Sequence, residues 1–235
     1  MQERYAVYVA PEQGSELDLF GSGWLGRCAR TGLKLRQPSL PGIAGRELLE
    51  LTAAPRHYGF HATLVSPFAL KKGCALRDIL DRVRIVARGF APFDLSRLVV
   101  KEVGNFLALV PGRQDEAAAL AETCLRALQP LREPPSLAEM EKRRARGLTP
   151  TQERLLAGWG YPYVLQEYLF HFTLTGPVRD RACRRAQQRR IAEFAEPLRR
   201  KTHCVRSICL FCQESREAPF SLTHTLPLGD DRRRP

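Results

Sequence analysis

The sequence lacks several features that would place it in a common class. Its 235 residues contain no apolar run close to the ~20 residues of a membrane-spanning helix, so no membrane contact is expected. It has no glycine-rich loop ending in Lys-Ser/Thr, which argues against an ATP-driven kinase. The Gly-x-Ser-x-Gly motif of a serine nucleophile elbow is also absent. A second Cys-x-x-Cys to complement Cys209 and Cys212 is missing as well, so the sequence predicts neither a metal site nor another cofactor.

Acidic residues are scarce relative to basic ones. Lysine and arginine number 37 against 25 aspartates and glutamates, and the net charge of +12 favours an anionic partner. The cysteines number seven, which is odd and without a regular framework, as in proteins of a reducing compartment. The chain opens on a strand-like segment rather than a signal peptide. We therefore expect a cytoplasmic protein; oligomeric state cannot be predicted from these features.

One stretch of the chain occurs twice. Residues 58–67 and 168–177 both read Tyr-x-Phe-His-x-Thr-Leu-x-x-Pro, which gives six identities in ten positions at an offset of 110 residues. This offset is too long for a solenoid repeat and suits one half of a duplicated domain. Each copy is apolar, contains threonine and ends at a proline, as expected of a short strand.

The repeated pattern points to a specific chemistry. Residues two apart on a strand share a face, so His61 and Thr63 point one way, and His171 and Thr173 do the same in the second copy. By the same alternation Thr175 is expected on that face. A histidine can accept or donate a proton near neutral pH, and a threonine hydroxyl can hold a phosphate oxygen. Two such strands facing one another would supply both the acid and the base for splitting a phosphodiester.

The doubled motif resembles the two-histidine phosphoesterase superfamily, which includes cyclic phosphodiesterases and bacterial RNA 2′-5′ ligases. Residues 4–11, 104–111 and 158–163 are similar to one branch, uncharacterised bacterial proteins often encoded with phosphonate-metabolism genes. The similarity runs through about residues 4–180. It implies that the four histidine and threonine residues form the catalytic site.

The order of predicted elements favours an α+β fold. We expect two pseudo-symmetric lobes, each a small antiparallel sheet with helices on its outer face, and a cleft between them that carries the two His-x-Thr strands. The chain is predicted to form a single bilobal domain over residues 1–235. The lobe transition and a basic helical insertion occupy about residues 111–165, and residues 229–235 form a frayed tail.

Two further residues are candidates for substrate binding. Tyr8 lies in the first predicted strand, where it can either reach the cleft or belong to the core. Arg56 stands just before the first motif, where it can either bind a phosphate or remain solvated.

The sequence thus predicts a metal-independent phosphodiesterase, a hydrolase acting on a small anionic cyclic or short diester such as a phosphonate-pathway sugar phosphate. Two alternatives remain open, each with RNA as the partner. One is RNA end processing at 2′,3′-cyclic or 2′-5′ linkages. The other is a non-catalytic module that binds RNA or nucleotides, for which salt-sensitive binding independent of the histidines would be diagnostic.

Overall fold

The computed structural model describes residues 3–145 and 147–229. Of the predicted frayed tail, 229–235, only Gly229 lies within this part, where its N–H donates to the Ala87 carbonyl (3.0 Å). No helix of the described chain has the length and apolar character needed to span a membrane.

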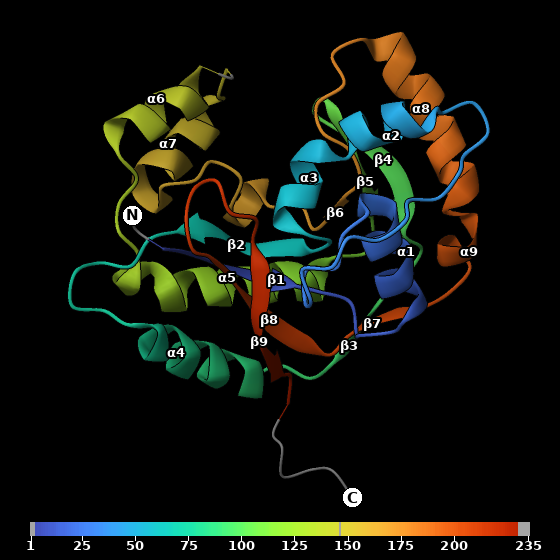
Figure 1. Cartoon of the computed structure of the whole chain (residues 1–235). Helices are drawn as coiled ribbons and strands as arrows, with labels where there is room; N and C mark the ends of the chain where they lie inside the picture. Colours follow the sequence, from blue (N-terminus) through green and yellow to red (C-terminus); the bar gives the residue numbers. More distant parts are fainter. Residues whose placement is uncertain (1–2, 146, 230–235) are drawn as a thin grey trace, which may run out of the picture.

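The centre of the molecule is a twisted antiparallel sheet (Figure 1). In the described residues it contains seven strands in the order β4-β5-β6-β2-β1-β8-β9, so the two motif strands, β2 and β6, are neighbours in its middle. A separate two-stranded sheet pairs β3 with β7. The strands are β1 (Arg4–Val9), β2 (Ala62–Phe68), β3 (Phe93–Leu95), β4 (Val99–Val103), β5 (Phe106–Val110), β6 (Phe172–Thr173), β7 (His203–Val205), β8 (Ser207–Gln213) and β9 (Ser221–Pro227).

The two sequence halves exchange their hairpins. The β4–β5 hairpin follows the first motif strand in the chain but pairs with β6, the second motif strand. The β8–β9 hairpin follows β6 but pairs with β1, next to β2. Each half of the sheet therefore contains strands from both halves of the sequence, which ties the repeats into one unit.

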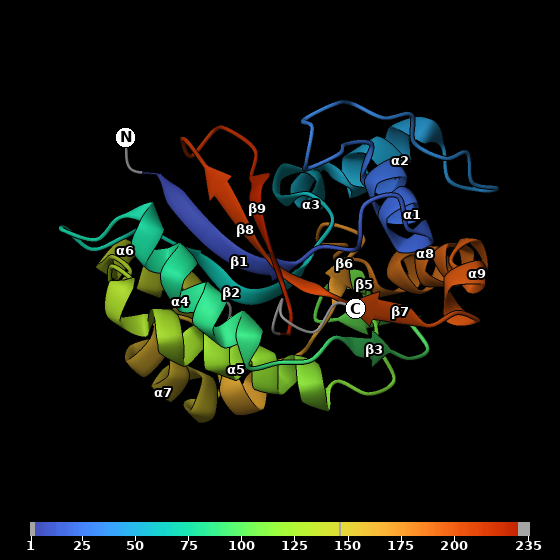
Figure 2. The same ribbon diagram turned by 90° about the horizontal axis from the view of Figure 1, so that it is seen from below.

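Helices cover the outer face of each half of the sheet (Figure 2). Helices α4 and α5 lie side by side against the half that contains β2, β8 and β9, and α8 packs on β4 and β5 at the other end. Apolar residues of both halves join in one core. The helices are α1 (Glu16–Leu25), α2 (Gly45–Leu51), α3 (Ala53–Tyr58), α4 (Leu76–Arg88), α5 (Asp115–Leu128), α6 (Leu137–Arg144), α7 (Pro150–Trp159), α8 (Arg181–Phe194) and α9 (Glu196–Arg199), with 3-10 turns η1 (Gln129–Leu131) and η2 (Leu165–Glu167).

The predicted α+β class, with antiparallel strands and outer helices, is confirmed. Several boundaries differ from those that the sequence predicts. The sequence of residues 93–100 predicts a single strand, but the chain turns at Arg97, whose φ is 48°, and forms β3 and β4 instead. The second motif strand, expected over 168–175, pairs regularly only at Phe172 and Thr173. The range 111–165, where a helical insertion is predicted, contains α5, α6 and α7, of which α6 and α7 stand together at one side of the sheet (Figure 1).

Close packing between α1 and the first motif gives a stability prediction. A Cβ at Gly21 would lie 1.9 Å from Cδ1 of the buried Phe60 ring, directly before His61 in the chain. We expect Gly21→Ala to lower the free energy of unfolding by about 1–3 kcal/mol, because the ring must move within a packed core. Urea denaturation would measure the loss. Gly23→Ala is the control, since no atom lies within 4 Å of its added Cβ. This substitution should not lower the free energy of unfolding. Equal stability of the two variants would contradict this packing.

Candidate active site

The two motif strands bring all four predicted catalytic residues to one face of the sheet. Ala62 of β2 is paired with Phe172 of β6, and both side chains are buried on the core side. In an antiparallel pair, the residues next to this position point to the opposite side. The register therefore places Thr63 across from His171, and His61 across from Thr173. All four are half-buried, which leaves part of each side chain accessible.

Both histidine rings are held by the backbone in the same way. His61 Nδ1 lies 2.9 Å from the Gly59 carbonyl, and His171 Nδ1 lies 2.8 Å from the Leu169 carbonyl. A carbonyl oxygen can only accept, so each Nδ1 carries the hydrogen and each Nε2 is left for chemistry. The Thr63 hydroxyl lies 3.3 Å from His61 Nε2 and donates to it when the ring is neutral.

Gly59 has a structural role in this arrangement. Its φ is 78°, a conformation that favours glycine, and an added Cβ would lie 2.5 Å from Cβ of Ala29. The chain can therefore turn from α3 into the motif and aim the Gly59 carbonyl at the His61 ring. The second copy has Leu169 at this position, so the two repeats reach the same histidine orientation by different backbone routes.

The environments of the two histidines are not equal. Burial lowers the pKa of His61 to about 4; the Gly59 hydrogen bond opposes this shift, and the nearby His171 adds to it. Burial also lowers the pKa of His171 from its ordinary 6.5, against the hydrogen bond to Leu169. Both shifts favour the neutral form of the ring.

Aromatic side chains explain the burial of His61. The Tyr8 ring stacks on it with a centroid distance of 3.6 Å and an angle of 15°, and Phe211 lies 5.9 Å away. Tyr8 is paired with Thr63 across β1 and β2, so it shares the face of the motif residues. Burial raises the pKa of the Tyr8 hydroxyl well above its ordinary value. The structure thus places this predicted substrate-binding residue against the first histidine, in a small second apolar cluster.

Arg56, the other predicted binding residue, is engaged elsewhere. It lies in α3 rather than at the start of a strand, and its guanidinium donates to the Leu25 carbonyl (2.7 Å), the Leu49 carbonyl (3.1 Å) and the Thr52 hydroxyl (2.6 Å). These bonds join the end of α1 to α2 and α3. The structure does not bring Arg56 together with the four motif residues, and its contacts are those of a structural residue.

Thr175 also departs from its predicted place. Its side chain is buried, and its hydroxyl accepts a hydrogen bond from the Leu107 N–H (3.0 Å). The N–H groups of Leu174 and Thr175 both donate to the Leu107 carbonyl, so regular pairing ends after Thr173 and the alternation of faces is lost.

Sequence reasoning missed two residues at the site. The Tyr168 hydroxyl donates to the Thr63 carbonyl (2.8 Å) and so ties the second motif to the first strand. Tyr168 is the first residue of the repeated pattern, and its recurrence with Tyr58 could have indicated a role at the site. Phe106 of β5 lies 5.5 Å from the His171 ring, and only the strand pairing reveals it. Within the described residues, no group of three or more His, Cys, Asp or Glu side chains is placed to hold a metal ion.

Similar solved structures extend over nearly the whole chain at low sequence identity. E. coli LigT complexed with 3′-AMP matches with a TM-score of 0.43 and 12% identity, covering 98% of this chain and 100% of LigT. Usb1 of Kluyveromyces marxianus matches with a TM-score of 0.42 and 12% identity, covering 97% and 98%.

Curated relatives are similar over most of this chain. A protein of Janthinobacterium sp. (strain Marseille) named ribose 1,5-bisphosphate phosphokinase PhnN is 40% identical over 173 residues, which are 73% of this chain and 38% of the relative. A protein of the same name from Laribacter hongkongensis (strain HLHK9) is 39% identical over 178 residues, 75% of this chain and 41% of the relative. This chain spans about two fifths of the length of these relatives.

A family model described as "Protein of unknown function (DUF1045)" matches residues 63–221. The match covers more than half of the chain and includes Thr63, His171 and Thr173. The chain therefore belongs to the DUF1045 family, and it carries the paired His-x-Thr strands through which it resembles the two-histidine phosphoesterases.

Proposed function

We propose that this chain is a metal-independent phosphodiesterase that hydrolyses a cyclic or short phosphodiester with two histidines as base and acid. The observation that carries the proposal is the adjacency of β2 and β6, which sets His61, Thr63, His171 and Thr173 on one partly exposed face. A phosphate seated between the strands would meet a ring nitrogen and a hydroxyl from each side. This is the set of groups that an in-line displacement at phosphorus needs.

We assign a role to each group on the basis of this geometry. His61 Nε2, which accepts from the Thr63 hydroxyl in the free protein, is released when that hydroxyl turns to the phosphate and takes a proton from the attacking water as the new P–O bond forms. His171 Nε2, protonated, gives its proton to the leaving oxygen as the other P–O bond breaks. Thr63 and Thr173 donate hydrogen bonds to the non-bridging oxygens, where negative charge grows. The products are a phosphate monoester and a free hydroxyl.

The surroundings of His61 support this assignment of base and acid. A base must be neutral and an acid protonated in the same enzyme molecule, so a ring whose pKa is strongly lowered suits the base. His61 has its pKa lowered to about 4 by burial, with Tyr8 stacked on it. We assign the base to His61 and the acid to His171.

The curated relatives favour a sugar phosphate as the substrate. Their name describes enzymes that phosphorylate ribose 1,5-bisphosphate, a pentose with two phosphate monoesters. A phosphodiesterase working beside such a kinase would form that compound by opening a cyclic diester of a pentose phosphate, with the second phosphate untouched. This agrees with the resemblance to proteins encoded with phosphonate-metabolism genes. The kinase activity itself is not proposed for this chain, which has no glycine-rich Lys-Ser/Thr loop.

A substrate panel tests the proposal. Purified protein with chelator present would be assayed on a ribose cyclic phosphate, nucleoside 2′,3′-cyclic phosphates, a 2′-5′-linked dinucleotide and an aryl phosphodiester. Turnover of at least one diester, lost in His61→Ala and His171→Ala, is the expected result. Turnover confined to the 2′,3′-cyclic or 2′-5′ compounds would favour RNA end processing. RNA binding without turnover, unaffected by either substitution, would favour a binding module and overturn the proposal.

The pH dependence of kcat/KM follows from the two pKa shifts. Activity should rise with pH through the pKa of His61, about 4, because the base must lose its proton. It should fall with pH through the pKa of His171, which lies below 6.5, because the acid must keep its proton. Initial rates over this range should therefore trace a bell with an acidic optimum. An optimum above neutral pH would contradict the lowered pKa values of the two histidines.

A further inference from the structure

A free cation lies on the same face of the sheet as the catalytic residues. Lys101 of β4 is paired with Ala108 of β5, and Ala108 is paired with Thr173 of β6. Paired residues share a face, so the three form one row across the sheet. Lys101 is exposed, and the structure gives its ammonium group no hydrogen bond or ion pair with any residue in 3–145 or 147–229.

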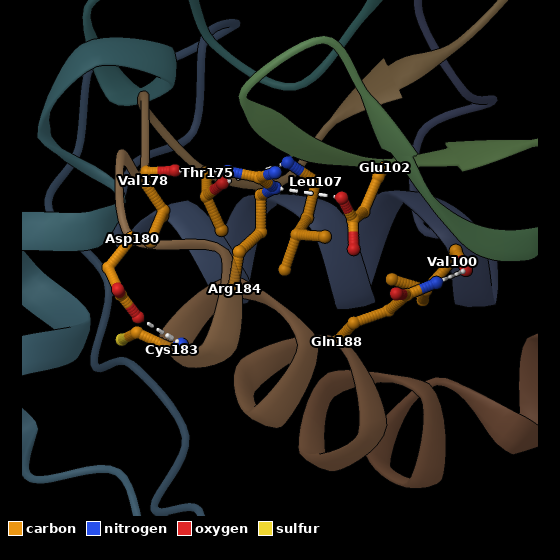
Figure 3. A network of polar contacts seen from close by, with 9 residues as sticks. All are labelled: Val100, Glu102, Leu107, Thr175, Val178, Asp180, Cys183, Arg184 and Gln188. Atoms are coloured by element: carbon orange, nitrogen blue, oxygen red, sulfur yellow. Dashed lines mark hydrogen bonds and ion pairs between the residues drawn. The ribbon is translucent and has the colours of Figure 1, made fainter.

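The residues around Lys101 show that its position is fixed by the fold. Its neighbour Glu102 points to the other face, where it forms an ion pair with Arg184 of α8 (2.9 Å), and the same guanidinium donates to the Val178 carbonyl (2.6 Å). Figure 3 shows these contacts beside the bond between Thr175 and the Leu107 N–H. This network joins the β4–β5 hairpin to the chain that leaves β6. The strand that carries Lys101 is thereby fixed relative to the strand that carries Thr173, with β5 between them.

The distance suits a substrate with two anionic groups. Neighbouring strands lie about 4.8 Å apart, so the Lys101 and Thr173 backbones are separated by about 10 Å. The flexible lysine stem can bring its ammonium group back over the small Ala108 towards Thr173. A phosphate held at the threonine and a second phosphate on the far side of one pentose ring would fit between these groups. The Phe106 ring, beside His171, offers an apolar wall along the way.

Other cations are less suited to this task. Arg4 lies on the same face of β1, but its Nε donates to the Gln213 side chain (2.8 Å) and its guanidinium stacks over Phe220. Arg56 is bound by three protein oxygens, as described above. Of these three cations, only Lys101 has no protein partner in the described chain.

We propose that Lys101 binds a second phosphate of the substrate, one sugar unit away from the diester that is hydrolysed. This inference rests on the proposed function and narrows it: the preferred substrate is a sugar phosphodiester that also carries a phosphate monoester. Lys101 is then a specificity residue that selects for the bis-anionic compound without touching the reacting bonds.

Two substrates that differ by one phosphate test the assignment. The kcat/KM values for cytidine 2′,3′-cyclic phosphate and for its 5′-phosphorylated form would be measured with wild type, Lys101→Met, Lys101→Arg and Lys72→Met. Wild type should prefer the 5′-phosphorylated compound about tenfold, as expected for one hydrogen-bonded ion pair. Lys101→Met should lose the preference and Lys101→Arg should keep most of it. Lys72, an exposed lysine in the loop after β2, is the control, and its substitution should leave the ratio unchanged.

A binding measurement separates this inference from the proposed function. Calorimetric titration compares the affinities for adenosine 3′,5′-bisphosphate, which has two phosphate groups, and adenosine 3′-monophosphate, which has one. Neither compound contains a diester, so binding is measured without turnover. The bisphosphate should bind wild type about tenfold more tightly than the monophosphate, and Lys101→Met should bind the two equally. If no diester is hydrolysed but wild type still binds the bisphosphate about tenfold more tightly, the catalytic proposal fails, and the assignment of Lys101 as a phosphate-binding residue stands. No preference in wild type, or the same preference in Lys101→Met, would overturn the inference.

Discussion

Alanine in place of His171 is expected to lower kcat for diester hydrolysis by about 10²–10⁴-fold, the usual contribution of a positioned general acid. The loss should depend on the leaving group. An alkoxide leaving oxygen needs the proton from His171, whereas a nitrophenolate can leave without it. His171→Ala should therefore retain far more activity on a nitrophenyl diester than on a sugar diester. Rates on both substrates, measured at the pH optimum, check this expectation.

Alanine in place of His61 should behave differently. The base acts on the attacking water, so His61→Ala should lose activity on both substrates by similar factors, again about 10²–10⁴. His224→Ala is a matched control, because His224 is half-buried on β9 and its Nδ1 is hydrogen-bonded to the neighbouring Thr223 hydroxyl rather than to a motif residue. It should retain wild-type rates. If His61→Ala were the variant rescued by a good leaving group, the roles of the two histidines would be reversed.

The central part of the site could be predicted from the sequence because the motif repeats. A strand alternates its faces whatever it pairs with, so the common orientation of His61 and Thr63 followed from their spacing. The side-by-side arrangement of the two motif strands is a tertiary feature, and only the doubling of the pattern indicated it. The lowered pKa values of His61 and His171 could not be predicted, because they depend on burial that only the fold creates, including the Tyr8 ring stacked on His61.

The predicted positions of Arg56 and Thr175 were wrong because tertiary contacts, and not the local sequence pattern, determine where these side chains lie. Arg56 precedes a strand-like motif and follows Pro55, a residue that usually breaks a helix, so the sequence did not predict its place in a short helix ending at Tyr58. Proline is tolerated in the first turn of a helix, where its missing N–H is not needed. Thr175 was assigned by alternation to the catalytic face, and the irregular hydrogen bonding at Leu107 turned it inward. Alternation predicts a face only while the strand remains regular.

The exchange of hairpins between the two halves of the sequence could not be predicted from the sequence pattern either. Order along the chain suggested that β4 and β5 would complete the sheet of the first motif, since consecutive strands usually pair. They pair with β6 instead. Lys101 therefore comes from the first half of the sequence but lies in a row with Thr173 from the second.

The ion pair that supports this hairpin should be important for stability. The Arg184 side chain is 10% exposed and that of Glu102 is 27% exposed, so removal of the carboxylate leaves a nearly buried guanidinium without its counter-charge (Figure 3). Loss of one partner of a fully buried pair costs about 3–5 kcal/mol, and the partial exposure of Glu102 reduces our expectation to about 2 kcal/mol for Glu102→Gln. Urea denaturation would measure this change in the free energy of unfolding.

The control and a double variant separate charge from packing. Glu122→Gln breaks the exposed pair with Arg126 on α5, whose side chains are 46% and 57% exposed, and should cost no more than about 0.5 kcal/mol. Replacing both Glu102 and Arg184 with leucine removes the buried charge together with its partner, so part of the lost stability should return. If the double variant were less stable than Glu102→Gln alone, the bond from Arg184 to the Val178 carbonyl would be the more important contact. The network would then stabilise the hairpin mainly by fixing the chain after β6.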